Sequence, residues 1–144
     1  MKKFIFLIAI AMLASLNASA DQKQVITFAQ LPQAAQDAIS KNFNTTNISY
    51  VMKENGRSVE YEVRFNNGTE VEFDADGALK EVDCKNATVP DALIPSDVLT
   101  YVKTTFPAAT ITEWGRDDNG YEAKLNNGLK LEFDSSYRFL RIDN

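Results

Sequence analysis

The chain has 144 residues, of which 15 are lysine or arginine, 20 are aspartate or glutamate and none is histidine. Its net charge of −5 at pH 7 repels phosphate backbones and anionic membranes, so nucleic acid is a poor partner. Without histidine, Ser-His-Asp and Cys-His catalysis and the commonest zinc sites are excluded, because imidazole is the usual base near neutral pH and a leading metal ligand. We therefore expect no enzyme activity, no cofactor and neither catalytic nor metal-binding residues.

The first twenty residues have the layout of a secretory signal. Lys2 and Lys3 precede an apolar run at 4–16, and small residues follow up to Ala20. The run is about 13 residues long, whereas a membrane-spanning helix takes about 20. We therefore expect cleavage after Ala20 and a periplasmic or secreted protein without membrane insertion.

Two short helices are predicted, one after each of the pairs Leu31-Pro32 and Ile94-Pro95, because proline suits the first turn of a helix. Apolar residues then recur every four positions, so each helix should bury one stripe. The stripes are Ala35, Ile39 and Phe43 in the first helix, and Val98, Val102 and Phe106 in the second.

After each helix the apolar period changes to two, which indicates half-buried strands. The strand at 59–65 leads through Asn66-Asn67-Gly68 into a second one, and a three-residue loop with Gly68 in the left-handed conformation pairs Val63 with Val71 and Tyr61 with Phe73. The same arrangement around Gly128 pairs Tyr121 with Phe133. Further strands are predicted at 48–53, 79–83, 111–114 and 139–143.

These elements occur twice in the sequence, since residues 61–83 align with residues 121–143 with nine of 23 positions identical. Upstream, the offset between the copies becomes 63. We predict an α+β fold, a tandem repeat of one helix plus about four antiparallel strands, with two units side by side. The boundaries are a signal peptide at 1–20, a first repeat with its N-terminal segment at 21–84, a connector at 85–93 and a second repeat at 94–144.

The repeated residues resemble the PepSY-like family of small exported bacterial proteins, whose fold is likened to that of beta-lactamase inhibitor protein. The resemblance rests on Leu31-Pro32, on Tyr61-Glu62-Val63 with Asn67-Gly68, on Glu72-Phe73-Asp74, and on their equivalents in the second copy. It implies an α+β repeat and a periplasmic location, and it transfers no catalytic residue. Inhibition of a partner enzyme would be an analogy of fold.

Candidate binding residues lie on the outward surface, mainly where the two copies differ. Trp114 is the strongest, because tryptophan is enriched at interface anchors, and Arg116 stands beside it. The alternative is a tryptophan packed at the seam between the copies. The other candidates are charged residues on the outer faces of the predicted strands, namely Glu60, Glu62, Arg64, Glu122 and Lys124.

Three functions remain open at this point. The leading one is a non-enzymatic binding module, inhibitor-like, that presents its polar sheet face to another periplasmic or surface protein. The alternative is sequestration of a small cationic ligand or metal ion near residues 74–83, where Asp74-Ala75-Asp76-Gly77 begins like a calcium loop but lacks the later ligands and also fits a plain turn. The third is a hydrolase using Glu62 and Glu72, which would need a raised carboxyl pKa, although strand alternation predicts solvated side chains there. The lone cysteine, Cys84, is a buried thiol, an exposed thiol or a link between chains.

Overall fold

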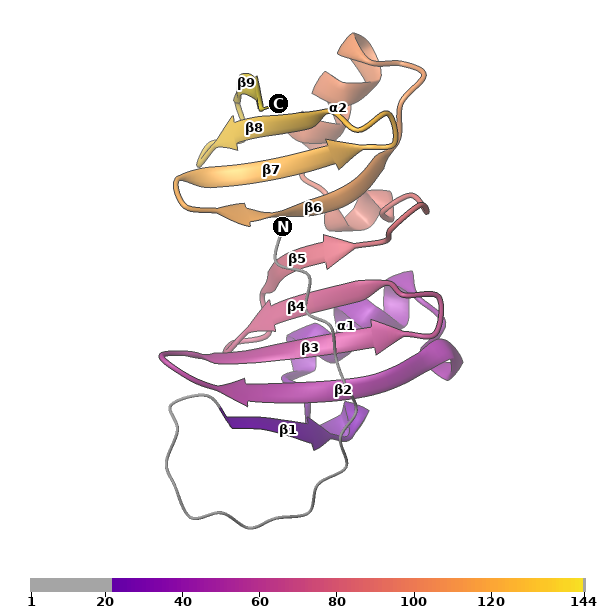
Figure 1. The fold of residues 1–144 in the computed structure, drawn as a ribbon, viewed down its shortest axis with the longest axis vertical. Coiled ribbons are helices and arrows are strands. Elements are labelled where there is room, and N and C mark those ends of the chain that lie inside the picture. Colours follow the sequence, from indigo (N-terminus) through magenta and orange to yellow (C-terminus); the bar gives the residue numbers. More distant parts are fainter. Residues whose placement is uncertain (1–21, 144) are drawn as a thin grey trace.

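The alternating strands form one antiparallel sheet with an apolar face and a polar face. The computed structural model describes residues 22–143, and in this part of the chain nine strands lie side by side in sequence order, each antiparallel to the next (Figure 1). The strands are β1 (Gln22–Ile26), β2 (Ile48–Asn55), β3 (Val59–Phe65), β4 (Glu70–Asp74), β5 (Leu79–Asp83), β6 (Ile111–Asp117), β7 (Gly120–Leu125), β8 (Lys130–Asp134) and β9 (Phe139–Asp143). The predicted signal peptide and its cleavage after Ala20 lie outside the described residues.

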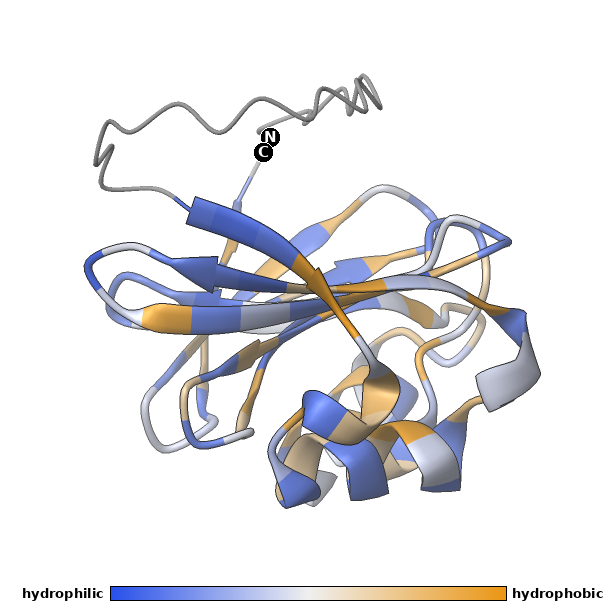
Figure 2. Cartoon of the chain, turned by 90° about the horizontal axis from the view of Figure 1, so that it is seen from below, coloured by the Kyte–Doolittle hydropathy of each residue, from blue (hydrophilic) through white to orange (hydrophobic). Residues whose placement is uncertain are grey.

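Two helices, α1 (Gln33–Asn42) and α2 (Ser96–Thr105), cover the same face of the sheet (Figure 2). Each begins directly after its proline, as predicted. The helical stripes supply the buried residues Ala35, Ile39, Val98 and Val102. Short 3-10 turns lie at Phe28–Gln30, Thr45–Asn47 and Asp91–Leu93. Within residues 22–143 no helix has the length and apolarity to cross a membrane.

The order of elements is the same in the two halves, because α1 precedes β2 to β5 and α2 precedes β6 to β9. This confirms the predicted α+β class, and each helix is followed by four antiparallel strands. The halves lie side by side within one sheet, since β5 pairs with β6 through Glu81–Gly115, Val82–Trp114 and Asp83–Glu113. Cys84, which ends the first repeat, and Val89 of the connector extend this pairing. They donate backbone hydrogen bonds to β6 residues Thr112 and Ile111 at 2.9 and 2.8 Å.

The edge strand β1 was not predicted. Its sequence, Gln22-Lys23-Gln24, lacks the apolar alternation that marks a half-buried strand, and four of its five residues are exposed. It forms because β2 offers an open edge, along which the two strands pair from Gln22–Asn55 to Ile26–Val51. Backbone hydrogen bonding therefore decides this element more than side-chain pattern does.

The hairpin register is the predicted one. Tyr61 pairs with Phe73 and Val63 with Val71, and Tyr121 pairs with Phe133 in the second half. Gly68 and Gly128 have φ values of 91° and 90°, the left-handed conformation that a three-residue loop requires and that glycine adopts without steric cost. Each loop closes with a backbone hydrogen bond, from Phe65 to Thr69 and from Leu125 to Leu129.

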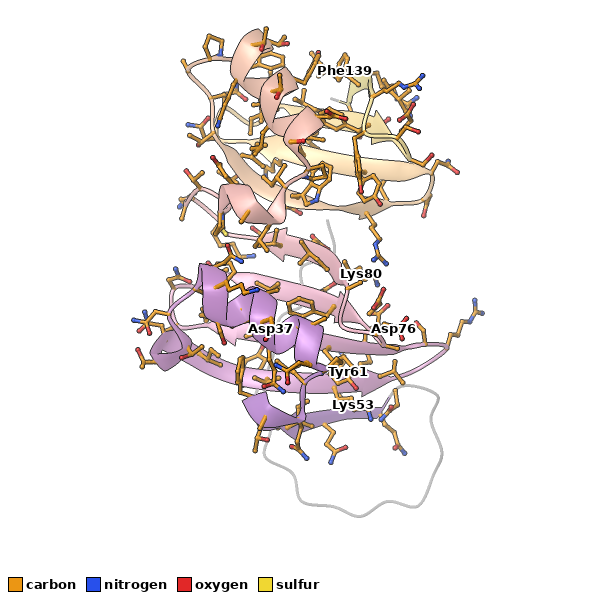
Figure 3. The ribbon with its side chains drawn as sticks, turned by 180° about the vertical axis from the view of Figure 1, so that it is seen from behind. Asp37, Lys53, Tyr61, Asp76, Lys80 and Phe139 are labelled. Atoms are coloured by element: carbon orange, nitrogen blue, oxygen red, sulfur yellow. The ribbon has the colours of Figure 1, made fainter. Side chains whose placement is uncertain are left out.

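One apolar core runs between the sheet and the helices. Phe73 and Phe133, at equivalent positions, are 0% and 1% exposed. In the second half, Tyr101 of α2 stacks on Phe139 of β9 with ring centroids 4.6 Å apart, and Figure 3 shows Phe139 beside that helix. Cys84 and Trp114 also belong to this core, so Cys84 is the buried thiol among its three alternatives.

Candidate functional site

The helix-free face of the sheet carries a row of glutamates. Successive strands place Glu62 opposite Glu72 and Glu72 opposite Glu81, then Gly115 opposite both Glu81 and Glu122. The row continues with Glu132 opposite Glu122. Neighbouring strands lie about 4.8 Å apart, so these carboxyl groups stand close together. We call Glu62, Glu72, Glu81, Glu122 and Glu132 the glutamate row.

The glutamate row is only half exposed, which corrects the expectation of solvated side chains. Burial, followed by the charge of Glu70, raises the pKa of Glu62. Burial also raises the pKa of Glu72, where the nearby Lys80 opposes the shift. In the second half, burial raises the pKa of Glu122 against the effect of Lys130. Alternation located the face correctly, but neighbouring side chains on a dense sheet exclude water from one another.

The strongest perturbation lies at the seam between the halves. Burial, a hydrogen bond with Glu113 and the charge of Glu72 raise the pKa of Glu81 to about 8. Gly115 provides the space for this pair, because a Cβ atom there would lie 3.1 Å from Glu81 Cγ. Glu81 therefore keeps its proton to a higher pH than an isolated glutamate does.

In the first half of the face, basic side chains form ion pairs with the glutamates. Arg64 pairs with Glu70 and lies 3.6 Å from Glu62, and Lys80 pairs with Glu60. The Tyr50 hydroxyl donates a hydrogen bond of 3.3 Å to Glu62. The structure thus brings the predicted residues Glu60, Glu62 and Arg64 together on one charged surface.

The second half of the face has a different charge pattern. Glu70 and Glu81 of the first half are replaced by Lys130 and Arg141. Arg141 forms an ion pair of 2.6 Å with Glu132. The predicted residue Lys124 lies in β7 opposite Lys130 and Glu113, next to Glu122 along the strand.

Trp114 is packed in the core, so the prediction that it is a surface anchor for a partner is wrong. Its side chain is 4% exposed and stacks on Tyr121 at a centroid distance of 5.2 Å with planes 3° apart. Trp114 is instead the tryptophan packed at the seam between the halves, because it lies in β6 and pairs with buried Val82 of β5. Arg116 lies on the surface, where both terminal guanidinium nitrogens are 3.2 Å from Asp74 Oδ2. This ion pair joins the two halves.

The loop at Asp74 is a turn. Asp74 Oδ1 accepts hydrogen bonds of 3.0 Å from the backbone N–H groups of Asp76 and Ala78, and Oδ2 accepts from Arg116. Partial burial raises the pKa of Asp74, but these hydrogen bonds outweigh it and the net shift is downward. Both oxygens are committed within the protein, as the plain-turn alternative requires.

A group of carboxylates does occur elsewhere on the face. Asp117, Glu122 and Glu132 each place an oxygen within 4.8 Å of the others. Oxygen ligands of this type suit calcium or magnesium. The sequence pattern missed this group because its members come from three strands.

The depression beside Glu62 and Glu72 is small. The two glutamates lie opposite each other with raised pKa values, but the adjacent depression has a volume of only about 20 Å³. That space holds about one water molecule.

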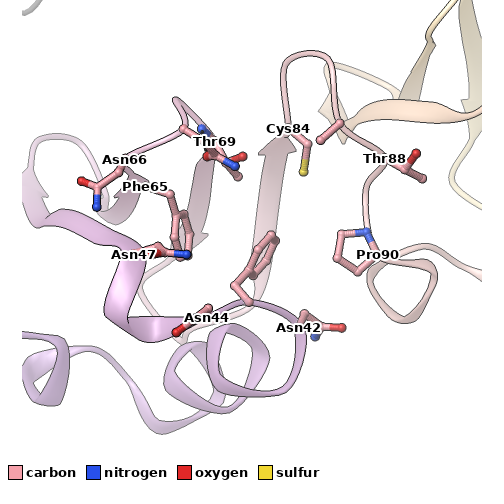
Figure 4. Close-up of a pocket in the computed structure, with 12 residues that line it drawn as sticks. Asn42, Asn44, Asn47, Phe65, Asn66, Thr69, Cys84, Thr88 and Pro90 are labelled. Carbon is pink, nitrogen blue, oxygen red and sulfur yellow. Dashed lines mark hydrogen bonds between the residues drawn. The ribbon is translucent and has the colours of Figure 1, made fainter.

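A larger cavity of about 580 Å³ lies beside the connector, at the end of the first half (Figure 4). Its lining is neutral and includes several asparagines, Thr88 and the buried Cys84. The asparagines serve local structure: Asn42 Nδ2 donates to Ala38 O, and the Oδ1 atoms of Asn44 and Asn67 accept from Thr46 and Thr69. Burial raises the pKa of the Cys84 thiol, which disfavours the reactive thiolate.

Sequence reasoning missed Glu81, Glu113 and Gly115 as members of the charged face. Glu132 and Glu72 were visible as an identical pair between the copies. The pairing of Glu81 with Glu113 was not visible, because it depends on β5 meeting β6 across the connector.

A family model described as "Putative beta-lactamase-inhibitor-like, PepSY-like" matches residues 18–60 and 59–141. No curated protein matches the chain.

Three solved structures of Bacteroides proteins are similar to the chain. A "putative periplasmic protein from DUF2874 family" of Bacteroides vulgatus is 37% identical, with a TM-score of 0.82 over 88% of this chain and 100% of that one. A "putative calcium-regulated periplasmic protein" of Bacteroides thetaiotaomicron is 39% identical, with a TM-score of 0.79 over 85% and 97%. A "putative periplasmic protein of unknown function" of B. vulgatus is 32% identical, with a TM-score of 0.76 over 86% and 99%. The chain belongs to the PepSY-like, beta-lactamase-inhibitor-like family.

Proposed function

We propose that this protein is a non-enzymatic periplasmic binding module whose polar sheet face binds a protein partner, in the manner of an inhibitor. The observation that carries the proposal is the glutamate row, which crosses both halves of the helix-free face. Burying charged groups costs free energy unless an opposite charge compensates them. A partner surface rich in lysine and arginine would provide that compensation along the row.

The proposal includes a tandem duplication and export. The repeated order of elements and the two segments matched by the family model support duplication. The similar Bacteroides proteins described as periplasmic support that location. Cell fractionation tests it, with the protein expected in the periplasmic fraction at a mass reduced by the loss of residues 1–20.

The binding test is a pull-down from periplasmic extract with the double variant Glu72→Gln/Glu122→Gln. Both substitutions keep the side-chain shape and remove charge, and neutral side chains suit these positions because burial raises the pKa of both carboxyls. We expect a specific partner to bind at least about tenfold more weakly and to dissociate as salt increases. Asp97→Asn, on the exposed surface of α2, is the matched control and should bind normally. Equal recovery with all three proteins would contradict the proposal.

The alternative is binding of a small cation or metal ion, favoured by the group of Asp117, Glu122 and Glu132. A similar protein described as calcium-regulated supports calcium as the first candidate. Calorimetry with calcium, magnesium and a polyamine tests this alternative. Heat that disappears in Glu132→Gln would support it, and no heat at about millimolar ligand would rule it out.

A further inference from the structure

The two edge strands of the sheet carry the exposed large apolar side chains of residues 22–143. These side chains are Val25 of β1, 69% exposed, and Leu140 and Ile142 of β9, 53% and 41% exposed. The rest of β1 is polar, with Gln22, Lys23 and Gln24. An apolar edge strand invites pairing with another strand, whereas lysine and other polar residues discourage it. The open edge with apolar character is therefore β9 (Figure 1).

The first half shows how an equivalent edge is completed. In the alignment at an offset of 60, β9 corresponds to β5, and Ile142 corresponds to Val82. Val82 is 0% exposed because β6 lies against β5 and places Trp114 opposite it. Among the described residues, no strand occupies the corresponding place beside β9. Ile142 thus occupies a core position that lacks its cover.

We propose that β9 pairs antiparallel with β9 of a second copy of this chain, about a two-fold axis at Ile142. This register sets the two Ile142 side chains opposite each other on the helix-bearing face. It also sets Arg141 opposite Asp143 of the second copy, and Asp143 opposite its Arg141, on the polar face, because directly opposed residues share a face. The pairing would thus cover the Ile142 side chains and set the opposite charges of Arg141 and Asp143 against each other.

Charge selects this register over its neighbours. A two-fold axis at Arg141 would place two arginines directly opposite, and an axis at Asp143 would place two aspartates opposite, which is destabilising. The interface is isologous and therefore closes as a dimer. A single pair of short strands buries less than the roughly 1,000 Å² typical of stable complexes, so the dimer should be reversible. It would extend the polar face across two molecules.

The test is sedimentation velocity and light scattering on the mature chain over a concentration series. We expect a monomer–dimer equilibrium for the unmodified protein. Ile142→Lys should weaken dimerisation at least about tenfold, because it places two ammonium groups at the axis. Val25→Lys, at the opposite edge, is the matched control and should dimerise normally. Circular dichroism should show that both variants are folded.

A charge swap distinguishes the proposed register from other edge contacts. Arg141→Asp and Asp143→Arg should each weaken the dimer by creating like-charge pairs, and the double variant should restore it. A protein that is monomeric at about millimolar concentration, or a dimer lost in Val25→Lys and retained in Ile142→Lys, would overturn the proposal. Failure of the double variant to restore dimerisation would also count against the Ile142 axis.

Discussion

The two halves of this sheet share a core and differ at the surface. Phe73 and Phe133 are fully buried at equivalent positions, and the turns at Gly68 and Gly128 have the same conformation. On the polar face, however, Glu70 and Glu81 of the first half correspond to Lys130 and Arg141 of the second. The strands β5 and β9 also differ, since β5 pairs with β6 on its outer side, whereas β9 is an edge strand of the described sheet. Core and turn residues therefore maintain one scaffold, while the face and the free edge are where the halves can acquire separate roles.

The largest effect is expected in the core, where the two halves place equivalent residues. Phe73→Ala and Phe133→Ala each remove a buried ring, and each should lower the free energy of unfolding by about 3–5 kcal/mol. Because the halves share one sheet, each variant should unfold in a single transition in urea. Costs that differ by more than about 2 kcal/mol, or two separate transitions, would show that the halves are energetically distinct.

The next largest effect is expected in the turn between β4 and β5, which contains Gly77. Gly77 has a φ of 83°, and a Cβ atom there would lie 2.7 Å from Pro32 Cβ at the start of α1. Gly77→Ala should therefore cost about 2 kcal/mol or more, combining left-handed strain with this clash. Gly128→Ala is the matched control, because φ is 90° but no atom lies within 4 Å, so about 1 kcal/mol of strain should remain. Equal costs in urea denaturation would show that the turn yields without disturbing α1.

In the second half, the position equivalent to Gly77 is Tyr137, which holds a φ of 64° despite its side chain. Its ring lies 4.9 Å from Tyr121 and 6.4 Å from Trp114, so aromatic packing offsets the backbone strain. Glycine would relieve the strain but remove these contacts.

The seam should give the protein a pH-dependent stability. Glu81 has a folded pKa of about 8, above the ordinary glutamate value near 4.5, so folding takes up a proton between these values. The resulting stability is fully present below about pH 4.5 and is lost as pH rises through about 8. Because Glu81 is partly exposed, we expect a loss on the order of 1 kcal/mol.

Glu81→Gln should remove this contribution, since the amide keeps a hydrogen-bond donor for Glu113 and does not ionise. Its melting temperature should exceed that of the unmodified protein by a few degrees at about pH 9. Glu54→Gln, which removes a half-buried carboxylate from β2, is the matched control. An unchanged slope of stability against pH in Glu81→Gln would contradict the assignment.

The parts of the fold that sequence could predict are those set by local pattern. Helix stripes such as Ala35 and Ile39, and hairpin registers such as Val63 with Val71, follow from spacing and turn chemistry alone. The strand β1 could not be predicted this way, because its polar residues pair with β2 through the backbone.

The candidate binding face was harder to predict because it is built across strands. The sequence located Glu60, Glu62, Arg64, Glu122 and Lys124 on the outer face, and the structure places them there. The side chain of Trp114 follows the alternation of β6 into the core, while Arg116 meets Asp74 from 42 positions earlier in the chain. Burial of the glutamate row, likewise, depends on which strands become neighbours, and residue spacing carries no information on that.

The smallest expected effect belongs to the ion pair between Arg116 and Asp74. Asp134 occupies the equivalent place in the second half, and its Oδ1 accepts the same backbone hydrogen bonds, from Ser136 and Arg138, at 2.8 and 3.0 Å. In the described part of the chain Asp134 has no arginine partner. Asp74→Asn and Asp134→Asn should therefore lose the same turn interactions, and Asp74→Asn should cost about 0.5 kcal/mol more.

That difference should fall toward zero in about 1 M salt, where exposed charges are screened. It should also vanish in an Arg116→Gln background, because the double variant isolates the ion pair from the turn. A difference that persists in the Arg116→Gln background would mean that the two turns, and not the contact across the seam, distinguish the halves here. Urea denaturation of Asp74→Asn and Asp134→Asn, each with and without Arg116→Gln, decides between these explanations.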